Sequence, residues 1–221
     1  MLERVLEPEA MDTPEEARDY DAMDFAAVNG LFVDDFLAAH GPCRGGELLD
    51  VGTGTARIPI TLAGIDPNAR VLAIDLAAEM LAVASRNVGA AGLVGRVRLG
   101  HGDAKVLGLA DASFEAVLCN SLVHHVPDPL PALAEMARLV APGGTLFVRD
   151  LARPSSDEDA VKLVDLHASS ESISARALFD ASLRAALTVD EVAAIAGRLG
   201  IVTPDIKMTS DRHWTWAWRR P

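Results

Sequence analysis

The stretch that decides the fold is Leu48-Leu49-Asp50-Val51-Gly52-Thr53-Gly54-Thr55-Ala56-Arg57. Its apolar start predicts a buried strand over 47–51, and the Gly-x-Gly turn that follows leads into a helix. Glycine lets the backbone turn sharply and lets a ligand approach it closely. The next apolar run, 70–75, ends in Asp75, where a carboxylate can accept both hydroxyls of a ribose. This order of strand, glycine turn, helix, strand and acidic residue predicts a cofactor site.

The elements around this unit repeat the same pattern. Short apolar runs alternate with amphipathic segments from residue 47 to residue 150, which is typical of βαβ units and a parallel sheet. After residue 150 the alternation lapses, and 152–187 predict two or three helices. The expected strands are 47–51, 70–75, 97–100, 115–120, 145–149, 201–208 and 212–218, and the expected helices include 25–37, 77–91, 129–140 and 188–199.

The composition favours a globular protein with a sizeable core. Of the 221 residues, 50% are hydrophobic and 24% are charged. With 20 basic and 32 acidic residues the net charge is −12, which opposes nucleic-acid binding and polybasic anchoring to a membrane. The sequence shows no apolar run long enough to span a bilayer and no signal-peptide pattern, and its two cysteines cannot build a disulfide framework. A cytoplasmic location is expected.

The acidity is concentrated near the N-terminus. Residues 1–24 hold nine acidic and two basic residues, a charge of −7 that leaves −5 for the rest of the chain, whereas 207–221 are basic. This arm is expected either to lie over a cationic cofactor, with Tyr20 in the lid, or to be a solvated leader. Because no basic surface bearing aromatic residues is evident beyond the short C-terminal tail, RNA is not an expected partner.

The glycine turn is compatible with two classes of cofactor. A dinucleotide site favours Gly-x-Gly-x-x-Gly, but Arg57 stands at the last of these positions and its bulk opposes close helix–strand packing. The other class carries acidic-x-Gly-x-Gly-x-Gly, which 50–56 match except that Ala56 replaces the last glycine. Alanine is small, so this exchange is expected to cost little unless φ must be positive there.

Three further motifs follow in order along the chain. They are Gly102-Asp103-Ala104, Asn120-Ser121-Leu122-Val123-His124-His125-Val126 and Pro142-Gly143-Gly144-Thr145-Leu146. With the glycine turn, these motifs over 47–150 resemble the class I S-adenosylmethionine (SAM)-dependent methyltransferases. The resemblance is closest to the type-11 group, which includes the ubiquinone and menaquinone biosynthesis enzymes.

The resemblance implies an α/β fold. We expect a doubly wound, mostly parallel seven-stranded Rossmann-like sheet whose last strand is antiparallel, with N-terminal helices and a helical insertion after the fifth strand. One methyltransferase domain is expected to span 1–221. Its parts are the acidic arm and helix (1–46), the SAM-binding core (47–150), a helical cap (151–187) and a C-terminal helix with a strand pair (188–221).

The resemblance also implies which residues hold the cofactor. All but Tyr20 follow the carboxyl ends of parallel strands, where open α/β sheets bind ligands. The implied contacts are Asp50, Gly52 and Gly54 to the methionine part, Asp75 to the ribose, Asp103 and Ala104 to the adenine, and Asn120 and Ser121 to the methionine part, with Leu76 also counted among the cofactor contacts. Tyr20 is added as a lid residue from the position of its segment before the first strand.

Methyl transfer from the sulfonium of SAM is an in-line displacement that leaves S-adenosyl-L-homocysteine. The enzyme contributes mainly proximity and alignment, worth up to ~7–11 kcal/mol. An oxygen or nitrogen acceptor can also need a base, and His124, His125 and Asp150 have suitable chemistry near the expected mouth. The competing interpretation is that the two histidines are structural polar groups. Adjacent histidines rarely converge on one metal ion and no third ligand has suitable spacing, so no metal site is predicted.

The three tryptophans, Trp214, Trp216 and Trp218, have strand spacing and therefore share one face. Core packing against a helix is the expected role, with an aromatic acceptor pocket as the alternative.

The function predicted from the sequence is SAM-dependent methyl transfer to a small-molecule acceptor. Two alternatives are a SAM-binding sensor or accessory subunit without transferase activity, and a nicotinamide-dependent oxidoreductase, which Arg57 disfavours. Neither the acceptor nor the oligomeric state is specified by the sequence.

Overall fold

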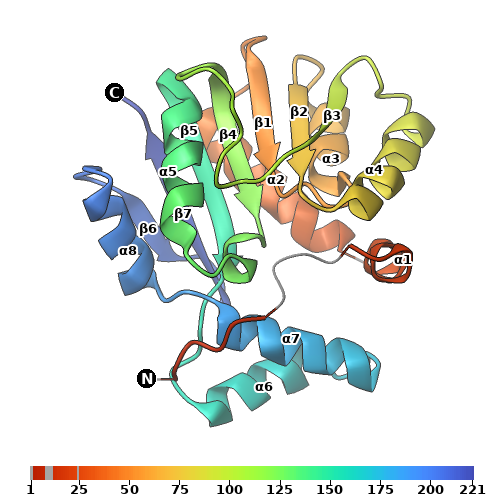
Figure 1. Ribbon diagram of the computed structural model, residues 1–221, viewed down its shortest axis with the longest axis vertical. Helices are drawn as coiled ribbons and strands as arrows, with labels where there is room; N and C mark the ends of the chain where they lie inside the picture. Colours follow the sequence, from red (N-terminus) through yellow and green to blue (C-terminus); the bar gives the residue numbers. More distant parts are fainter. Residues whose placement is uncertain (1, 8–11, 24) are drawn as a thin grey trace.

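The computed structural model describes residues 2–7, 12–23 and 25–221, so that Glu9 and Asp24 of the acidic arm lie outside the described residues. Seven strands form one sheet in the order β3-β2-β1-β4-β5-β7-β6 (Figure 1). The strands are β1 (Glu47–Val51), β2 (Arg70–Asp75), β3 (Val97–His101), β4 (Phe114–Asn120), β5 (Val140–Leu151), β6 (Asp205–Met208) and β7 (His213–Arg219).

Strands β1 to β5 run parallel, and β7 runs antiparallel to both β5 and β6. The predicted α/β sheet with an antiparallel last strand is therefore confirmed. The chain leaves β1 toward β2 on one side, while β4 lies on the other, so the strand order reverses at β1. The crevice at the carboxyl ends of β1 and β4 is where sheets of this kind bind ligands.

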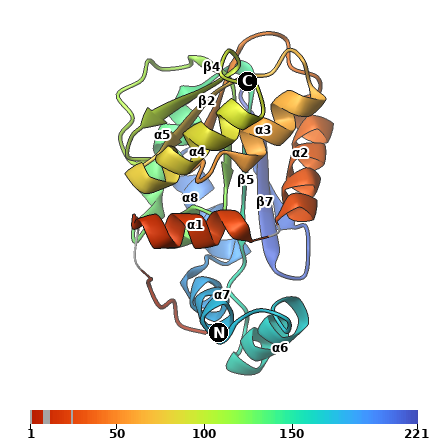
Figure 2. The same ribbon diagram turned by 90° about the vertical axis from the view of Figure 1, so that its right-hand side faces the viewer.

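Helices cover both faces of the sheet, as Figures 1 and 2 show. On one face lies a cluster that includes Phe32, Phe36 and Leu62, and on the other a cluster that includes Leu133 and Trp216; all five are fully buried. The helices are α1 (Pro14–Ala22), α2 (Ala26–His40), α3 (Arg57–Ile65), α4 (Ala78–Ala90), the 3-10 turn η1 (Val123–His125), α5 (Pro129–Leu139), α6 (Asp157–His167), α7 (Ile173–Ala185) and α8 (Val189–Arg198). None of the helices in the described part of the chain is long and apolar enough to cross a membrane.

The helical cap consists of the antiparallel pair α6 and α7, which lies beyond the carboxyl edge of the sheet (Figure 1). The N-terminal segment 2–7 runs along this pair (Figure 2). A backbone hydrogen bond holds this segment in place, since the N–H of Val5 donates to the carbonyl of Arg184 at 3.1 Å. The start of the chain therefore lies beside a helix about 180 residues away in sequence. Thr188 and Glu191 form a capping box at the start of α8.

The starts of two strands, β5 and β6, differ from the sequence prediction by several residues, whereas the other strand boundaries differ by at most two. Strand β5 begins at Val140 and not at residue 145, so Pro142-Gly143-Gly144 lies inside the strand. The cause is tertiary pairing: Gly143 N–H donates to the carbonyl of Arg220, and Arg220 N–H donates back to the carbonyl of Gly144. Strand β6 starts only at Asp205, after an exposed turn that includes Val202.

The tryptophans of β7 pack in the core, as predicted. Trp214 and Trp216 are fully buried, and Trp218 packs against the same cluster while staying partly exposed. Their indole rings fill the space beneath α8. The aromatic acceptor pocket is not their role in this structure.

Replacing Leu133 tests the packing of α5 on the sheet. Leu133 is fully buried, so Leu133→Ala removes its methyl groups from the core and should lower the free energy of unfolding by about 2–5 kcal/mol. Urea unfolding measures this. The control is Val94→Ala at a 69% exposed position, which should change stability by less than about 0.5 kcal/mol. Equal losses in the two variants would contradict the packing described.

Candidate active site

The glycine turn between β1 and α3 has a backbone that requires glycine. Gly52 has φ +76°, and a Cβ there would meet the Leu122 side chain at 3.0 Å. Gly54 has φ +54°. The backbone N–H groups of Gly52 and Thr53 both donate to the carbonyl of Ile74 in β2, at 2.9 and 3.0 Å. The turn is thereby held against the end of β2, where the predicted acidic residue lies.

Asp75 joins this turn to the next helix. Its Oδ2 accepts from Gly54 N–H at 2.7 Å, and its Oδ1 accepts from Ala77 N–H at 2.9 Å. Burial raises the pKa of Asp75, although these backbone hydrogen bonds oppose the shift. A carboxylate has about four acceptor positions, so Asp75 can support the turn and still accept from ligand hydroxyls.

Ala56 is strained, contrary to the expectation from sequence. Its φ is +62°, in the left-handed region, and it directly precedes α3. The last position of the acidic-x-Gly-x-Gly-x-Gly pattern therefore does require a positive φ. An alanine there costs about 1–2 kcal/mol relative to a right-handed conformation, so the replacement is not neutral.

Asp50 is a buried carboxylate beside this turn. It is 2% exposed, and its Oδ2 has no hydrogen-bond partner among the described residues. Burial raises its pKa to about 7. The hydroxyl oxygen of Thr55 in the turn is also buried and has no partner within the described part of the chain. Unsatisfied buried polar atoms cost free energy unless a ligand satisfies them, so this group fits a bound molecule that donates hydrogen bonds.

Helix α1 of the acidic arm packs beside the same turn. Tyr20 is the nearest side chain to Gly54, 3.6 Å from where a Cβ would lie. Burial, followed by the charges of Asp75 and Asp50, raises the pKa of Tyr20 to about 12. Arg57 helps to hold the helix, because it forms an ion pair with Asp21 at 2.9 Å. The part of the arm that contains Tyr20 therefore lies over the turn and is not a solvated leader.

The predicted adenine contacts lie just beyond β3. Asp103 accepts from the backbone N–H of Lys105 at 2.9 Å and pairs with its ammonium at 3.1 Å. These contacts lower the pKa of Asp103 and make it a turn-forming aspartate. Ala104 packs at the edge of the core. Leu76 follows Asp75 and is 37% exposed at the same edge.

The end of β4 carries the other predicted contacts. Asn120 closes the strand, and Ser121 turns the chain with φ +54°. The N–H of Ser121 donates to the carbonyl of Arg149 at 2.9 Å, which keeps the turn attached to β5. The following 3-10 turn η1 presents His124 and His125 close to the end of β5.

His124 and Asp150 form a buried pair. Their Nδ1 and Oδ1 atoms are 2.5 Å apart, and Asp150 Oδ2 also accepts from the backbone N–H of His124 at 3.1 Å. Burial opposes charge on both groups, but each holds its partner ionised. The pKa of His124 is raised and that of Asp150 lowered. The three predicted catalytic residues are thus brought together, since the rings of His124 and His125 lie 4.1 Å apart.

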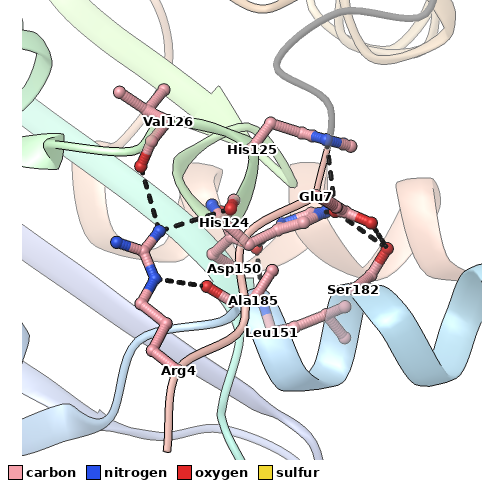
Figure 3. Close-up of polar contacts among 9 residues, drawn as sticks. All are labelled: Arg4, Glu7, His124, His125, Val126, Asp150, Leu151, Ser182 and Ala185. Atoms are coloured by element: carbon pink, nitrogen blue, oxygen red, sulfur yellow. Dashed lines mark hydrogen bonds and ion pairs between the residues drawn. The ribbon is translucent and has the colours of Figure 1, made fainter.

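The sequence did not indicate Glu7 as a site residue. Its Oε1 lies 3.4 Å from His124 Nε2 and 3.2 Å from His125 Nδ1 (Figure 3). Glu7 reaches them because Arg4 anchors the N-terminal segment: its guanidinium donates to the carbonyls of Ala185 at 2.6 Å and Val126 at 2.9 Å. Nothing in the pattern around Glu7 signals this contact, which depends on residues more than a hundred positions away.

The known proteins that this chain resembles in sequence are methyltransferases. Residues 49–148 match the family model described as a methyltransferase domain. The ubiquinone biosynthesis O-methyltransferase of Xanthomonas campestris pv. campestris is 38% identical over 122 residues, which cover 54% of this chain and 48% of that protein. The demethylmenaquinone methyltransferase of Bacillus cytotoxicus is 38% identical over 112 residues, covering 50% and 47%. The chain therefore spans about half the length of these curated relatives.

A solved structure with a similar fold is that of Haemonchus contortus phosphoethanolamine N-methyltransferase 2, crystallised with phosphomonomethylethanolamine and S-adenosylhomocysteine. Its TM-score is 0.72 at 16% sequence identity, and the match covers 95% of this chain and 58% of that one. The fold of this chain is therefore the fold of that methyltransferase, and its residues 49–148 match a methyltransferase domain in sequence. The curated proteins that it resembles include ubiquinone and menaquinone biosynthesis methyltransferases.

The raised pKa of Asp50 makes a prediction about stability. The folded protein keeps a proton on Asp50 up to about pH 7, whereas the unfolded chain loses it near 3.8. The free energy of unfolding therefore falls as pH rises through this window. Asp50→Asn removes the buried charge and should stabilise the ligand-free protein at pH 8 by on the order of 2–4 kcal/mol, with a much smaller gain at pH 5.

Chemical denaturation at the two pH values measures this difference. The control is Asp205→Asn, because the Asp205 side chain is 58% exposed and should contribute little at either pH. If Asp50→Asn gave no gain at pH 8, Asp50 would not be the uncompensated buried charge described here.

Proposed function

We propose that this protein transfers a methyl group from SAM to a small-molecule acceptor. The observation that carries the proposal is the buried carboxylate of Asp50, which has an unpartnered oxygen beside a positive-φ glycine turn. A cationic ligand with N–H donors satisfies both the charge and the hydrogen-bonding capacity of this group. The ammonium end of SAM has this chemistry.

We call the glycine turn, Asp50, Asp75 and the residues at the ends of β3 and β4 the SAM cradle. Its other residues have roles that follow from their positions. Gly52 and Gly54 allow the ligand to approach the backbone, and Asp75 has acceptor positions for the ribose hydroxyls. Leu76 follows Asp75 at the end of β2, and Asp103 and Ala104 stand beyond the end of β3 for the adenine. Asn120 and Ser121 bound the methionine part from the end of β4. Tyr20 contributes a lid that excludes water over the turn.

SAM supplies an electrophilic methyl group on a sulfonium. In the transfer, a lone pair of the acceptor atom forms the bond to the methyl carbon while the C–S bond breaks, its electron pair stays on sulfur, and neutral S-adenosyl-L-homocysteine leaves. The chain holds both reactants in line and excludes water. An acceptor oxygen or nitrogen is expected to lose its proton beside His124, His125 and Asp150, where Asp150 orients the His124 ring.

The relatives suggest which acceptor to test first. Two of them are named for ubiquinone and menaquinone biosynthesis, so quinone-type ring precursors are the first class of acceptor to screen. Helix α7 is expected to form one wall of the acceptor site, because it lies in contact with η1 beyond the end of β4.

The decisive experiment combines cofactor binding with transfer of label from SAM to a panel of acceptors. Asp75→Ala should weaken SAM binding about 10- to 100-fold by calorimetry, because it removes charge-assisted acceptors from the cradle. The exposed Asp205→Ala should bind SAM like the unmodified protein. A thermal melt checks that Asp75→Ala is folded, and Asp75→Asn serves if it is not.

The outcomes separate the competing functions. Labelled product supports methyl transfer, while SAM binding without transfer to any acceptor would favour a sensor or accessory subunit. Preferential stabilisation by NAD would favour an oxidoreductase. Near-unchanged SAM binding by Asp75→Ala would contradict the assigned cradle.

A further inference from the structure

We propose that Glu7, His124 and His125 bind a divalent transition-metal ion such as Zn²⁺, with Asp150 orienting His124 from behind. Ion binding itself does not depend on methyl transfer. The catalytic use of the ion rests on the proposed function, because the site lies at the same edge of the sheet as the SAM cradle.

The spacing of the three side chains matches metal ligation. One ligand atom from each of Glu7, His124 and His125 lies within 4.8 Å of the other two. Glu7 Oε1 is 3.2 Å from His125 Nδ1 and 3.4 Å from His124 Nε2. Two ligands bound tetrahedrally at about 2.0–2.1 Å from Zn²⁺ lie roughly 3.3–3.4 Å apart. The carboxylate oxygen is therefore at ligand spacing from both imidazoles.

The adjacent histidines converge, contrary to the expectation from sequence. In an extended strand their rings would point to opposite sides. The 3-10 turn η1 instead brings the ring centroids to 4.1 Å, with an interplanar angle of 35°. The third ligand, whose spacing in sequence gave no indication of a site, arrives from the N-terminal segment that Arg4 anchors.

Two further contacts orient the ligands. Asp150 Oδ1 lies 2.5 Å from His124 Nδ1, so Nδ1 keeps its proton and Nε2 is the atom that gives up its proton to become the ligand atom. Histidine ligands of metals commonly donate their other N–H to a carboxylate in this way. The hydroxyl of Ser182 donates to the carboxylate of Glu7, at 3.1 and 3.2 Å from its two oxygens. Orienting partners are thus present for a histidine ligand and for the carboxylate ligand.

Burial and charge favour a cation at this point. The side chains of Glu7, His124 and His125 are 9%, 5% and 17% exposed, and that of Asp150 is 1% exposed. Two carboxylates therefore share a nearly dry space. The guanidinium of Arg4, in the same N-terminal segment as Glu7, directs its N–H groups to backbone carbonyls. A divalent ion balances both carboxylates and removes the cost of burying them together.

The donor set selects the kind of ion. Two imidazoles and one carboxylate suit Zn²⁺, Co²⁺ or Fe²⁺, whereas Mg²⁺ prefers oxygen ligands. Three protein ligands leave at least one position open, as in catalytic zinc sites. An acceptor hydroxyl bound there would lose its proton more easily, and the proton would leave to solvent before oxygen attacks the methyl carbon.

The test is metal binding by the full, tag-free chain after treatment with chelator. We expect one Zn²⁺ per chain by calorimetry, and one Co²⁺ with the visible absorption bands of a low-coordinate nitrogen–oxygen site. Glu7→Gln and His125→Ala should each weaken Zn²⁺ affinity at least 10- to 100-fold, and Asp150→Asn should weaken it about 10-fold or more. Mg²⁺ should not compete.

The matched control is His101→Ala, which removes an exposed histidine outside the cluster and should leave stoichiometry and affinity unchanged. Thermal melts show whether each variant is folded, and His125→Asn replaces His125→Ala if the latter is not. Absence of Zn²⁺ and Co²⁺ binding, or binding that Glu7→Gln and His125→Ala leave intact, overturns the proposal. Because Glu7→Gln should still bind SAM while Asp75→Ala should still bind Zn²⁺, failure of this site and failure of the SAM cradle are distinguishable.

Discussion

The hydrogen bonds from Gly54 and Ala77 to the carboxylate of Asp75 are the contacts on which the site depends. They tie the glycine turn after β1 to the start of α4, across two neighbouring parallel strands. These hydrogen bonds hold the glycine turn in place, and Gly52 and Gly54 keep positive φ angles there. Asp50 is buried beside the turn. The strain at Ala56 and the unsatisfied oxygen of Asp50 are the local costs, and such costs are typical of functional sites.

The N-terminal part of the chain completes the site in two places. Helix α1 brings Tyr20 over the glycine turn and is held by the ion pair of Asp21 with Arg57. Farther toward the N-terminus, Arg4 anchors the segment that carries Glu7 to the two histidines of η1. The excess of acidic residues in this arm therefore has a structural meaning: part of it lies beside a cofactor cradle and part of it beside imidazoles.

The features that could be predicted from sequence are the local ones. The glycine turn, Asp75 and the order of strands come from residues close together in the chain, and each element has its own signal in apolar periodicity or turn chemistry. The positive φ of Ala56 could not be predicted from the sequence. It depends on how the turn after β1 joins helix α3 in the folded protein. The early start of β5 was missed because it depends on pairing with Arg220, some 75 residues later.

By itself, the amino-acid sequence determined the class of fold, the glycine turn with Asp75 at the end of the next strand, and the presence of histidines after the fourth strand. The tertiary structure alone decided that η1 turns the two imidazoles side by side, that Asp150 lies behind one of them, and that Glu7 meets both. The physical reason is the range of the interactions. A turn or a strand end is set by neighbours in the chain, whereas a cluster drawn from the N-terminus, η1 and β5 exists only once the sheet and its cap have packed.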